Sequence, residues 1–283
     1  MKLAFSTNAY MRMPVEQAIE RIASIGYEGV ELMADVPHLW PAGLLETQKA
    51  TCREALQRYG LAISNVNAFM MNAVADPRQP YWHPSWIEPY APYRRIRIEH
   101  TKRALTLAKE LGAPNITTEP GGPVPPQMTF EVALRTFVEV LKPVAEHAER
   151  EGVLLLVEPE PGLLIERSEQ YLAFTERIDS PAVGLNLDIG HMYCVNEDPA
   201  EAIRKLAPHI RHVHLEDIAP SREHRHLIPG YGAINFRSCL AALKEIGYSG
   251  WITIELYPYV DDPDGAAKEA FDAIKPLLEE LNE

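Results

Sequence analysis

The strongest constraint on the fold is an alternation of short apolar segments with amphipathic segments, repeated eight times along the 283 residues. This order is typical of parallel β-α-β units. The strand candidates are KLAFS from Lys2, GVELM from Gly29, AISNVNA from Ala62, NITTE from Asn115, VLLLVEP from Val153, AVGLNLD from Ala182, IRHVHLED from Ile210 and WITIEL from Trp251. Eight such units predict a single α/β domain over residues 1–283, folded as a (β/α)₈ TIM barrel.

The segments between the strand candidates have the pattern of helices. VEQAIERIASIG ends at Gly26 and TFEVALRTFVEVLKPVAEHAEREG ends at Gly152, where glycine is the usual helix-ending residue. An open, doubly wound sheet is the alternative architecture. It is disfavoured because the first strand runs into STNA at residues 6–9 instead of a glycine-rich phosphate-binding turn.

One connection is longer than the others. Residues 69–93, after the third strand, contain Trp82, Trp86 and several tyrosines and prolines. A long loop on the C-terminal side of a barrel strand overhangs the active-site mouth and is usually functional. We therefore expect this aromatic-rich loop to border the pocket, with Trp82 contacting substrate.

Charge and cysteine content narrow the functional classes. The formal charge is −13, from 40 acidic and 27 basic residues, which disfavours nucleic acid as the main partner. The three cysteines are widely spaced and fit no metal-ligand pattern, so we expect reduced thiols in a cytoplasmic protein. No apolar run approaches the ~20 residues that cross a bilayer, and we expect neither export nor a membrane anchor. A homo-oligomer is compatible with this sequence.

Four consecutive strand candidates end with an ionisable side chain. These are Glu158, Asp188, His214 and Glu255. Catalytic groups of TIM barrels project from the C-terminal ends of the strands. The alternation of side chains along a strand allows all four to point inward together. Each carboxylate alone fits a salt bridge or helix cap, and His214 alone fits a buried core histidine, but together they predict a shared site.

Three carboxylates and an imidazole at one rim would repel one another unless a cation neutralised them. The residues therefore predict one bound divalent metal. An oxygen-rich donor set with one nitrogen suits manganese first, with magnesium, cobalt or zinc as alternatives.

The chain resembles the xylose isomerase-like TIM-barrel superfamily, which includes sugar 3-epimerases, inosose isomerases and dehydratases, and type IV apurinic endonucleases. The resemblance covers essentially the whole chain. Its carriers are VEP at Val157–Pro159, LNLDIGH at Leu185–His191, HVHLED at His212–Asp217, PGYGAINF at Pro229–Phe236 and GYSGWITIEL at Gly247–Leu256. In the single-metal epimerases the ligands are Glu, Asp, His and Glu from strands five to eight, which the resemblance places on the same four residues.

The resemblance also implies roles. It makes Glu158 and Glu255 the acid/base pair for proton transfer through an enediolate, and it matches His191 to a histidine that contacts substrate hydroxyls. An arginine after the seventh strand contacts substrate in the epimerases. Arg222 is the counterpart, but it lies farther along the chain, which argues against a tagatose-type or psicose-type substrate.

Two further residues are expected to contact substrate on their position alone. Glu160 follows Glu158 by two residues, so it can point toward the same pocket, although neighbouring prolines leave its direction open. Asn67 offers a hydroxyl-binding amide from the third strand, where a turn-forming asparagine is the plainer interpretation.

The leading hypothesis is a metal-dependent isomerase or epimerase acting on a keto-sugar or cyclitol. The runner-up is a lyase or dehydratase on a keto-inositol or keto-glycoside, which begins with the same proton abstraction. An apurinic endonuclease draws on His191, His224 and His226, but Asn65 and Asn67 stand where histidines are expected. A catalytically inactive sugar-binding subunit is the non-enzymatic alternative.

Overall fold

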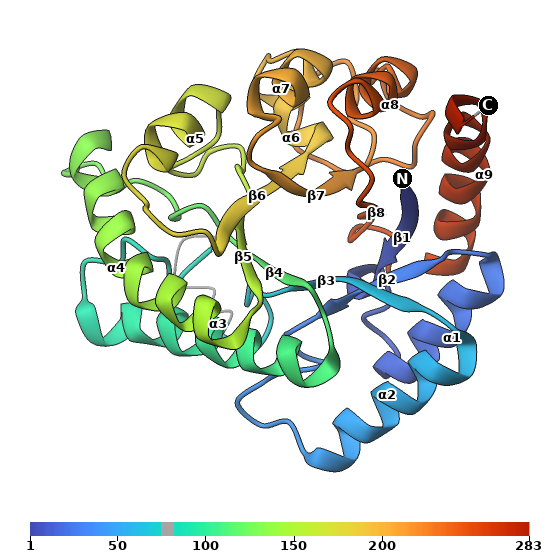
Figure 1. Cartoon of the computed structure of the whole chain (residues 1–283), viewed down its shortest axis with the longest axis horizontal. Helices are drawn as coiled ribbons and strands as arrows, with labels where there is room; N and C mark the ends of the chain where they lie inside the picture. Colours follow the sequence, from blue (N-terminus) through green and yellow to red (C-terminus); the bar gives the residue numbers. More distant parts are fainter. Residues whose placement is uncertain (75–81, 283) are drawn as a thin grey trace.

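The computed structural model describes residues 1–74 and 82–282. Eight parallel strands follow one another around a closed barrel, and β1 pairs with β8 to complete it (Figure 1). The strands are β1 (Lys2–Ser6), β2 (Gly29–Met33), β3 (Ala62–Asn67), β4 (Asn115–Thr118), β5 (Leu154–Val157), β6 (Val183–Asp188), β7 (Ile210–Leu215) and β8 (Trp251–Ile254). The predicted TIM barrel is confirmed.

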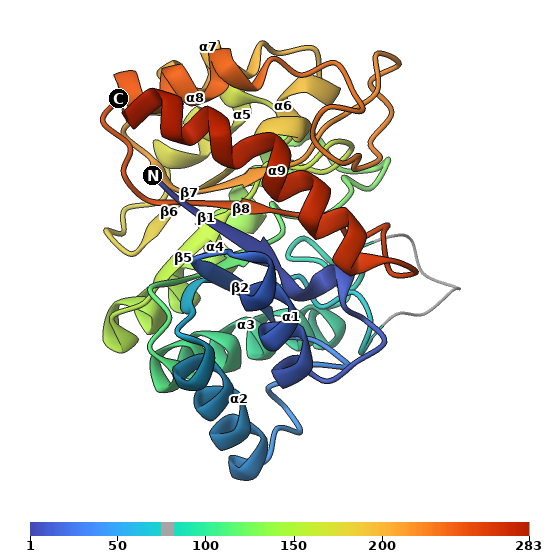
Figure 2. The same ribbon diagram turned by 90° about the vertical axis from the view of Figure 1, so that its right-hand side faces the viewer.

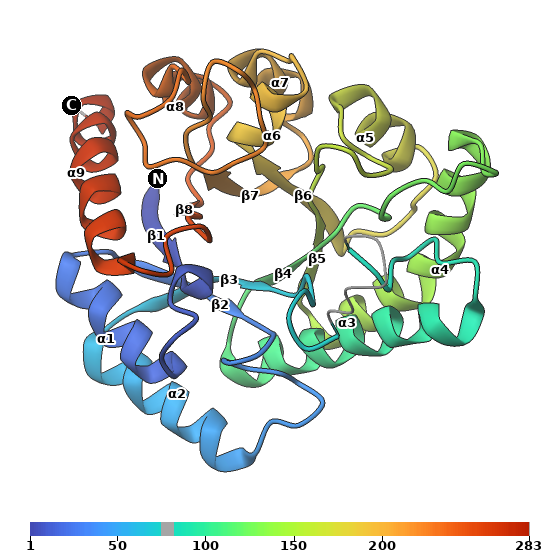
Figure 3. The same ribbon diagram turned by 180° about the vertical axis from the view of Figure 1, so that it is seen from behind.

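Helices surround the barrel, as the view from behind also shows (Figure 3). They are η1 (Thr7–Ala9), α1 (Val15–Ile25), α2 (Glu46–Tyr59), α3 (Ala91–Leu111), α4 (Phe130–Glu151), α5 (Ser168–Thr175), α6 (Ile189–Cys194), α7 (Pro199–Leu206), α8 (Phe236–Glu245) and α9 (Pro263–Asn282). α1 ends at Gly26, whose φ of 114° favours glycine, as the sequence predicts. α9 packs against α1 and α8 and closes the ring (Figure 2).

The strands are buried on both faces because the helices cover their outer side. Apolar side chains such as Val30, Ile116 and Val213 belong to the main core. The barrel also encloses polar side chains, for example Ser64 and Thr253, whose hydroxyls lie 3.0 Å apart. The polar interior continues toward the strand ends, where the candidate site lies. In the described part of the chain, no helix has the length and apolar character needed to cross a membrane.

The long connection after β3 runs from residue 68 to residue 90, close to the predicted 69–93. Its residues 75–81 lie outside the described part of the chain. Trp86 is fully buried, with its indole N–H donating to Thr118 Oγ1 at 3.1 Å and its ring packed against Phe137 of α4. Trp86 thus anchors the connection to the outer layer of the barrel.

His100 on α3 should make the free energy of unfolding depend on pH. Its ring is buried and stacks on Trp40, with centroids 5.0 Å apart. Burial, with repulsion from Arg97, lowers the pKa of His100 to about 3. The unfolded chain takes up this proton near pH 6.5, so the free energy of unfolding falls as the pH drops below 6.5, by up to about 1.4 kcal/mol per pH unit.

We therefore expect His100→Gln to flatten the loss of stability between pH 6.5 and pH 4. The measurement is urea unfolding of both proteins across this range. The variant's deficit, if any, at pH 8 should shrink steadily as the pH falls. Parallel curves for the two proteins would contradict the prediction.

Candidate active site

The structure gathers the four strand-end residues at one rim of the barrel. Glu158 follows β5, Asp188 ends β6, His214 lies one residue before the end of β7, and Glu255 follows β8. One potential ligand atom from each lies within 4.8 Å of those of the other three, and all four residues are buried. Sequence reasoning placed these four side chains together, and the fold does bring them together.

This cluster is electrostatically unfavourable without a cation. Burial raises the pKa of Glu158 to about 7, with a smaller contribution from Asp188 and opposition from His214. Burial also raises the pKa of Glu255 well above its usual range. Within the described residues, Asp188 Oδ2 is buried and has no hydrogen-bond partner. A buried, unpartnered carboxylate oxygen facing other carboxylates is costly, so the cluster is suited to hold a positive charge.

Glu31 on β2 holds the imidazole of His214. Its Oε2 lies 2.6 Å from His214 Nε2, while His214 Nδ1 faces Glu158 Oε1 at 3.2 Å. Asn65 donates to the same Oε2 of Glu31 at 2.7 Å. Burial alone would raise the pKa of Glu31, but His214 beside it holds that pKa at about 2. This contact leaves Nδ1 as the ring atom directed at the other three residues.

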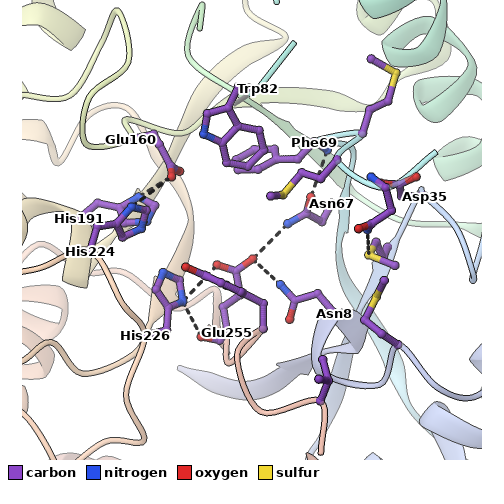
Figure 4. A pocket seen from close by; sticks show the side chains of 17 residues that line it. Asn8, Asp35, Asn67, Phe69, Trp82, Glu160, His191, His224, His226 and Glu255 are labelled. Carbon is purple, nitrogen blue, oxygen red and sulfur yellow. Dashed lines mark hydrogen bonds and ion pairs between the residues drawn. The ribbon is translucent and has the colours of Figure 1, made fainter. Parts of the chain in front are cut away.

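A cavity of about 240 Å³ lies beside the cluster and shares Glu255 with it (Figure 4). Its polar lining includes Asn67, Glu160, His191, His224, His226 and Glu255. Asn8 and Asn67 both donate to Glu255 Oε1, at 2.8 and 3.2 Å. The predicted substrate-binding residues Glu160, His191 and Asn67 therefore border one space, together with Trp82 from the long connection.

Arg222 does not line this cavity. Its guanidinium carbon lies 3.9 Å from the centroid of the Tyr193 ring and the group donates to the Tyr193 carbonyl. The side chain borders a separate surface depression with Tyr193 and Asn196. Arg222 therefore lies outside this cavity, where its guanidinium stacks on Tyr193, and its predicted contact with substrate stays a prediction.

Among the described residues of the long connection, some border the cavity as expected and others do not. Phe69, Met70 and Trp82 line it, whereas Trp86 is held in the outer layer by Thr118 and Phe137. Tyr81 lies outside the described residues. The prediction that this loop borders the pocket therefore holds for Phe69, Met70 and Trp82 but not for Trp86.

Sequence reasoning missed Asn8 and Glu216. Asn8 lies just beyond the end of β1, so the strand-end rule applied to β1 would have found it. Glu216 lies two residues after His214, and the same alternation would have placed it on the inner face. It is fully buried, and neither carboxylate oxygen has a hydrogen-bond partner among the described residues. Asp188, His191, Glu216 and His226 form a second group whose ligand-type atoms lie within 4.8 Å of one another.

An eight-stranded barrel with buried carboxylates and histidines at the C-terminal ends of β5 to β8 has the architecture of a TIM-barrel enzyme. The model of the xylose isomerase-like TIM barrel family matches residues 19–277. The chain belongs to this family.

Individual relatives agree with this assignment. Fructoselysine 3-epimerase of Escherichia coli O157:H7 is 25% identical over 99% of each chain. The crystal structure of a D-tagatose 3-epimerase-like protein matches with a TM-score of 0.85 and 26% identity, covering 100% of this chain and 98% of that one. The IOLI protein with a bound zinc atom shares the fold, with a TM-score of 0.81 and 21% identity over 99% of both chains.

Proposed function

We propose that the chain is a divalent-metal-dependent isomerase or epimerase that transfers a proton on a keto-sugar or cyclitol. The observation that carries this proposal is the cluster of Glu158, Asp188, His214 and Glu255 beside a cavity lined by hydroxyl-binding groups. The similarity to sugar epimerases supports it.

The donor set fits a divalent cation. Three carboxylates and one imidazole would supply mainly oxygen ligands, which suit manganese, our first expectation, and also magnesium, cobalt or zinc. The zinc atom in the related IOLI structure supports a divalent ion. A bound cation would polarise the substrate carbonyl and acidify the adjacent C–H bond.

Glu158 and Glu255 are the proposed proton carriers. Asn186 donates to Glu158 Oε2 at 2.6 Å, and Asn8 and Asn67 donate to Glu255 Oε1. Glu255 is thus oriented through one oxygen, whereas Glu158 is held at both, because His214 Nδ1 lies 3.2 Å from its Oε1. Because the two follow different strands, they can serve opposite faces of a planar intermediate, one removing a proton and the other returning it.

His191 and His224 are proposed to bind substrate hydroxyls. His191 Nδ1 lies 2.9 Å from the carbonyl oxygen of Pro159, so this nitrogen carries the proton and Nε2 is the acceptor. His191 Nε2 faces His224 Nε2 at 2.9 Å. Burial lowers the pKa of both rings to about 3, so both are neutral at physiological pH and offer one donor and one acceptor each. A neutral pair of this kind can both donate hydrogen bonds to and accept them from the two hydroxyls of a diol.

Glu31→Gln should weaken metal binding by about 10- to 100-fold, the usual effect of removing a carboxylate that orients a histidine ligand. Glutamine can still accept from His214 and Asn65 through one oxygen, but it lacks the negative charge that stabilises the Nε2 proton of His214 and so makes Nδ1 a weaker ligand. Calorimetric titration with Mn²⁺ measures the change. Glu119→Gln, another fully buried glutamate, is the matched control. Equal affinity in Glu31→Gln and wild type would contradict the role of Glu31.

The test of the proposed function is a panel of keto-sugars and inososes incubated with metal-reconstituted protein in deuterium oxide. Deuterium should appear at a carbon next to the carbonyl of at least one substrate, above the protein-free rate. An unsaturated product with loss of a hydroxyl or glycosidic group would favour the lyase instead. Absence of deuterium from every substrate would contradict proton transfer.

A further inference from the structure

The cavity has two chemically different sides. The first carries Glu160, His191, His224 and Glu255. The second, which we call the apolar wall, consists of Met11, Met33, Phe69, Met70 and Trp82. Figure 4 shows Trp82 and Phe69 across the open space from His226 and Glu255. The C–H face of a sugar can stack on an aromatic ring, but a wall that also carries Met11, Met33 and Met70 offers few partners to hydroxyls, so this division bears on the kind of substrate.

Phe69 and Trp82 of the apolar wall are held by packing and by hydrogen bonds to the neighbouring backbone. Phe69 and Trp82 meet edge to face, with ring centroids 4.9 Å apart and planes at 89°, and pack with Leu163 in a cluster separate from the main core. The fully buried Arg97 donates to the carbonyls of Ala68 and Phe69 on one flank of the connection, and to that of Pro84 on the other. A buried guanidinium that bonds both flanks fixes the position of the aromatic pair.

Asp35 and the amide of Asn72, two polar groups near the apolar wall, are already engaged, whereas Asn8 Oδ1 is buried without a partner among the described residues. Asp35 accepts from the backbone N–H groups of Val36, Asn72 and Ala73, at 2.8, 2.6 and 2.9 Å. The amide of Asn72 points to the sulfur of Met33 at 4.0 Å. A sugar hydroxyl placed here would lose its hydrogen bonds to water and find few new partners, which opposes its binding. An apolar group would bury its surface favourably.

The wall begins next to the reacting groups. Asn67 donates to Glu255 Oε1, and Phe69 follows Asn67 by two residues. Glu255 belongs both to the candidate metal cluster and to the cavity lining. A substituent on a sugar that reacts beside Glu255 therefore reaches Phe69 and Trp82 within the same cavity.

We infer that the substrate is a keto-sugar carrying an apolar, preferably aromatic, substituent, such as the aglycone of a keto-glycoside, and that the apolar wall binds this substituent. The inference rests on the proposed function for the reaction itself. It adds the chemical class of the part of the substrate that does not react.

The test compares methyl and phenyl β-D-glucopyranoside, which lack the carbonyl and do not react, by calorimetry on Mn²⁺-reconstituted protein. The phenyl glucoside should bind at least about tenfold more tightly, since a single methylene in an apolar pocket is worth about 10- to 200-fold. Phe69→Ser should bring the ratio of the two affinities below about threefold, while Phe69→Leu keeps more of it because apolar bulk remains. Phe130→Ser, at a half-exposed position outside the cavity, is the matched control and should keep the wild-type ratio.

The 3-keto forms of the same glucosides provide the second readout, as solvent deuterium uptake beside the carbonyl. Equal affinity for the two glucosides, or a ratio that Phe69→Ser leaves unchanged in folded protein, would overturn the inference. Tighter binding of an aminoethyl glucoside would also overturn it and implicate Asp35. If free ketoses take up deuterium but the phenyl glucoside binds no more tightly than the methyl glucoside, the inference about the substituent fails and the proposed function is kept. If the preference holds but no keto compound exchanges, the proposed reaction fails and the apolar subsite stands.

Discussion

Glu158→Gln and Glu255→Gln should each lower turnover by about 10²- to 10⁴-fold, the usual contribution of a positioned acid or base. Glutamine keeps an oxygen of similar size at each position but cannot carry the proton. Because Asn186 holds Glu158 and Asn8 holds Glu255 through one oxygen, the amide can occupy nearly the same place. Metal-loaded variants should therefore bind substrate and fail at proton transfer.

The measurement combines metal content with deuterium exchange on a substrate from the panel. Glu119→Gln is the control, because Glu119 is equally buried but belongs to none of the ligand-type clusters and accepts from the backbone of Trp86 and Gly121. Exchange near the wild-type rate in both metal-loaded variants would refute the two-carboxylate mechanism. A loss in only one would assign proton transfer to a single carboxylate.

Asp188→Ala and His214→Ala should each abolish stoichiometric binding of a divalent metal, with affinity reduced by more than about 100-fold, beyond the effect of an outer-shell residue. Wild-type protein should bind one equivalent. Its unfolding free energy should rise by about 2.7 kcal/mol when free metal exceeds the dissociation constant a hundredfold. Neither variant should show this gain, because each has lost one of the four residues that would hold the cation.

Elemental analysis and metal-dependent melting measure these effects. His209→Ala is the matched control, since His209 immediately precedes β7, at the opposite end of the strand from His214. Unchanged metal content in Asp188→Ala or His214→Ala would overturn the ligand assignment. A second bound equivalent in the wild type would implicate the group of Asp188, His191, Glu216 and His226.

The barrel and the four-residue cluster could be predicted because both depend on short-range rules. Strand and helix periods fix the order of elements, and the closure of parallel strands brings their C-terminal ends to one rim. To predict that Glu158 and Asp188 belong to the cluster, it was enough to know that each lies at a strand end and that side chains alternate along a strand. Nothing about the intervening helices had to be known.

Residues on connections were harder to place because their direction depends on contacts distant in sequence. Arg222 follows β7 as an epimerase arginine does, but its stacking on Tyr193 of α6 could not be read from its position. Trp86 has the composition of a pocket residue, yet Thr118 and Phe137 hold it in the outer layer. Arg97 lies on a helix of ordinary pattern, and only the fold shows that it bonds both flanks of the connection after β3.

The contact between Glu31 and His214 joins the two halves of the barrel. All four residues of the candidate metal cluster lie on or after β5 to β8, between residues 158 and 255, whereas Glu31 lies on β2. A chain divided between β4 and α4 would keep every donor atom on one fragment, but the imidazole would be oriented only after the other fragment docks. Reassembly of the two half-barrels would then be measurable as a gain in affinity for the ion, so the ion would report closure of the barrel as well as supply chemistry.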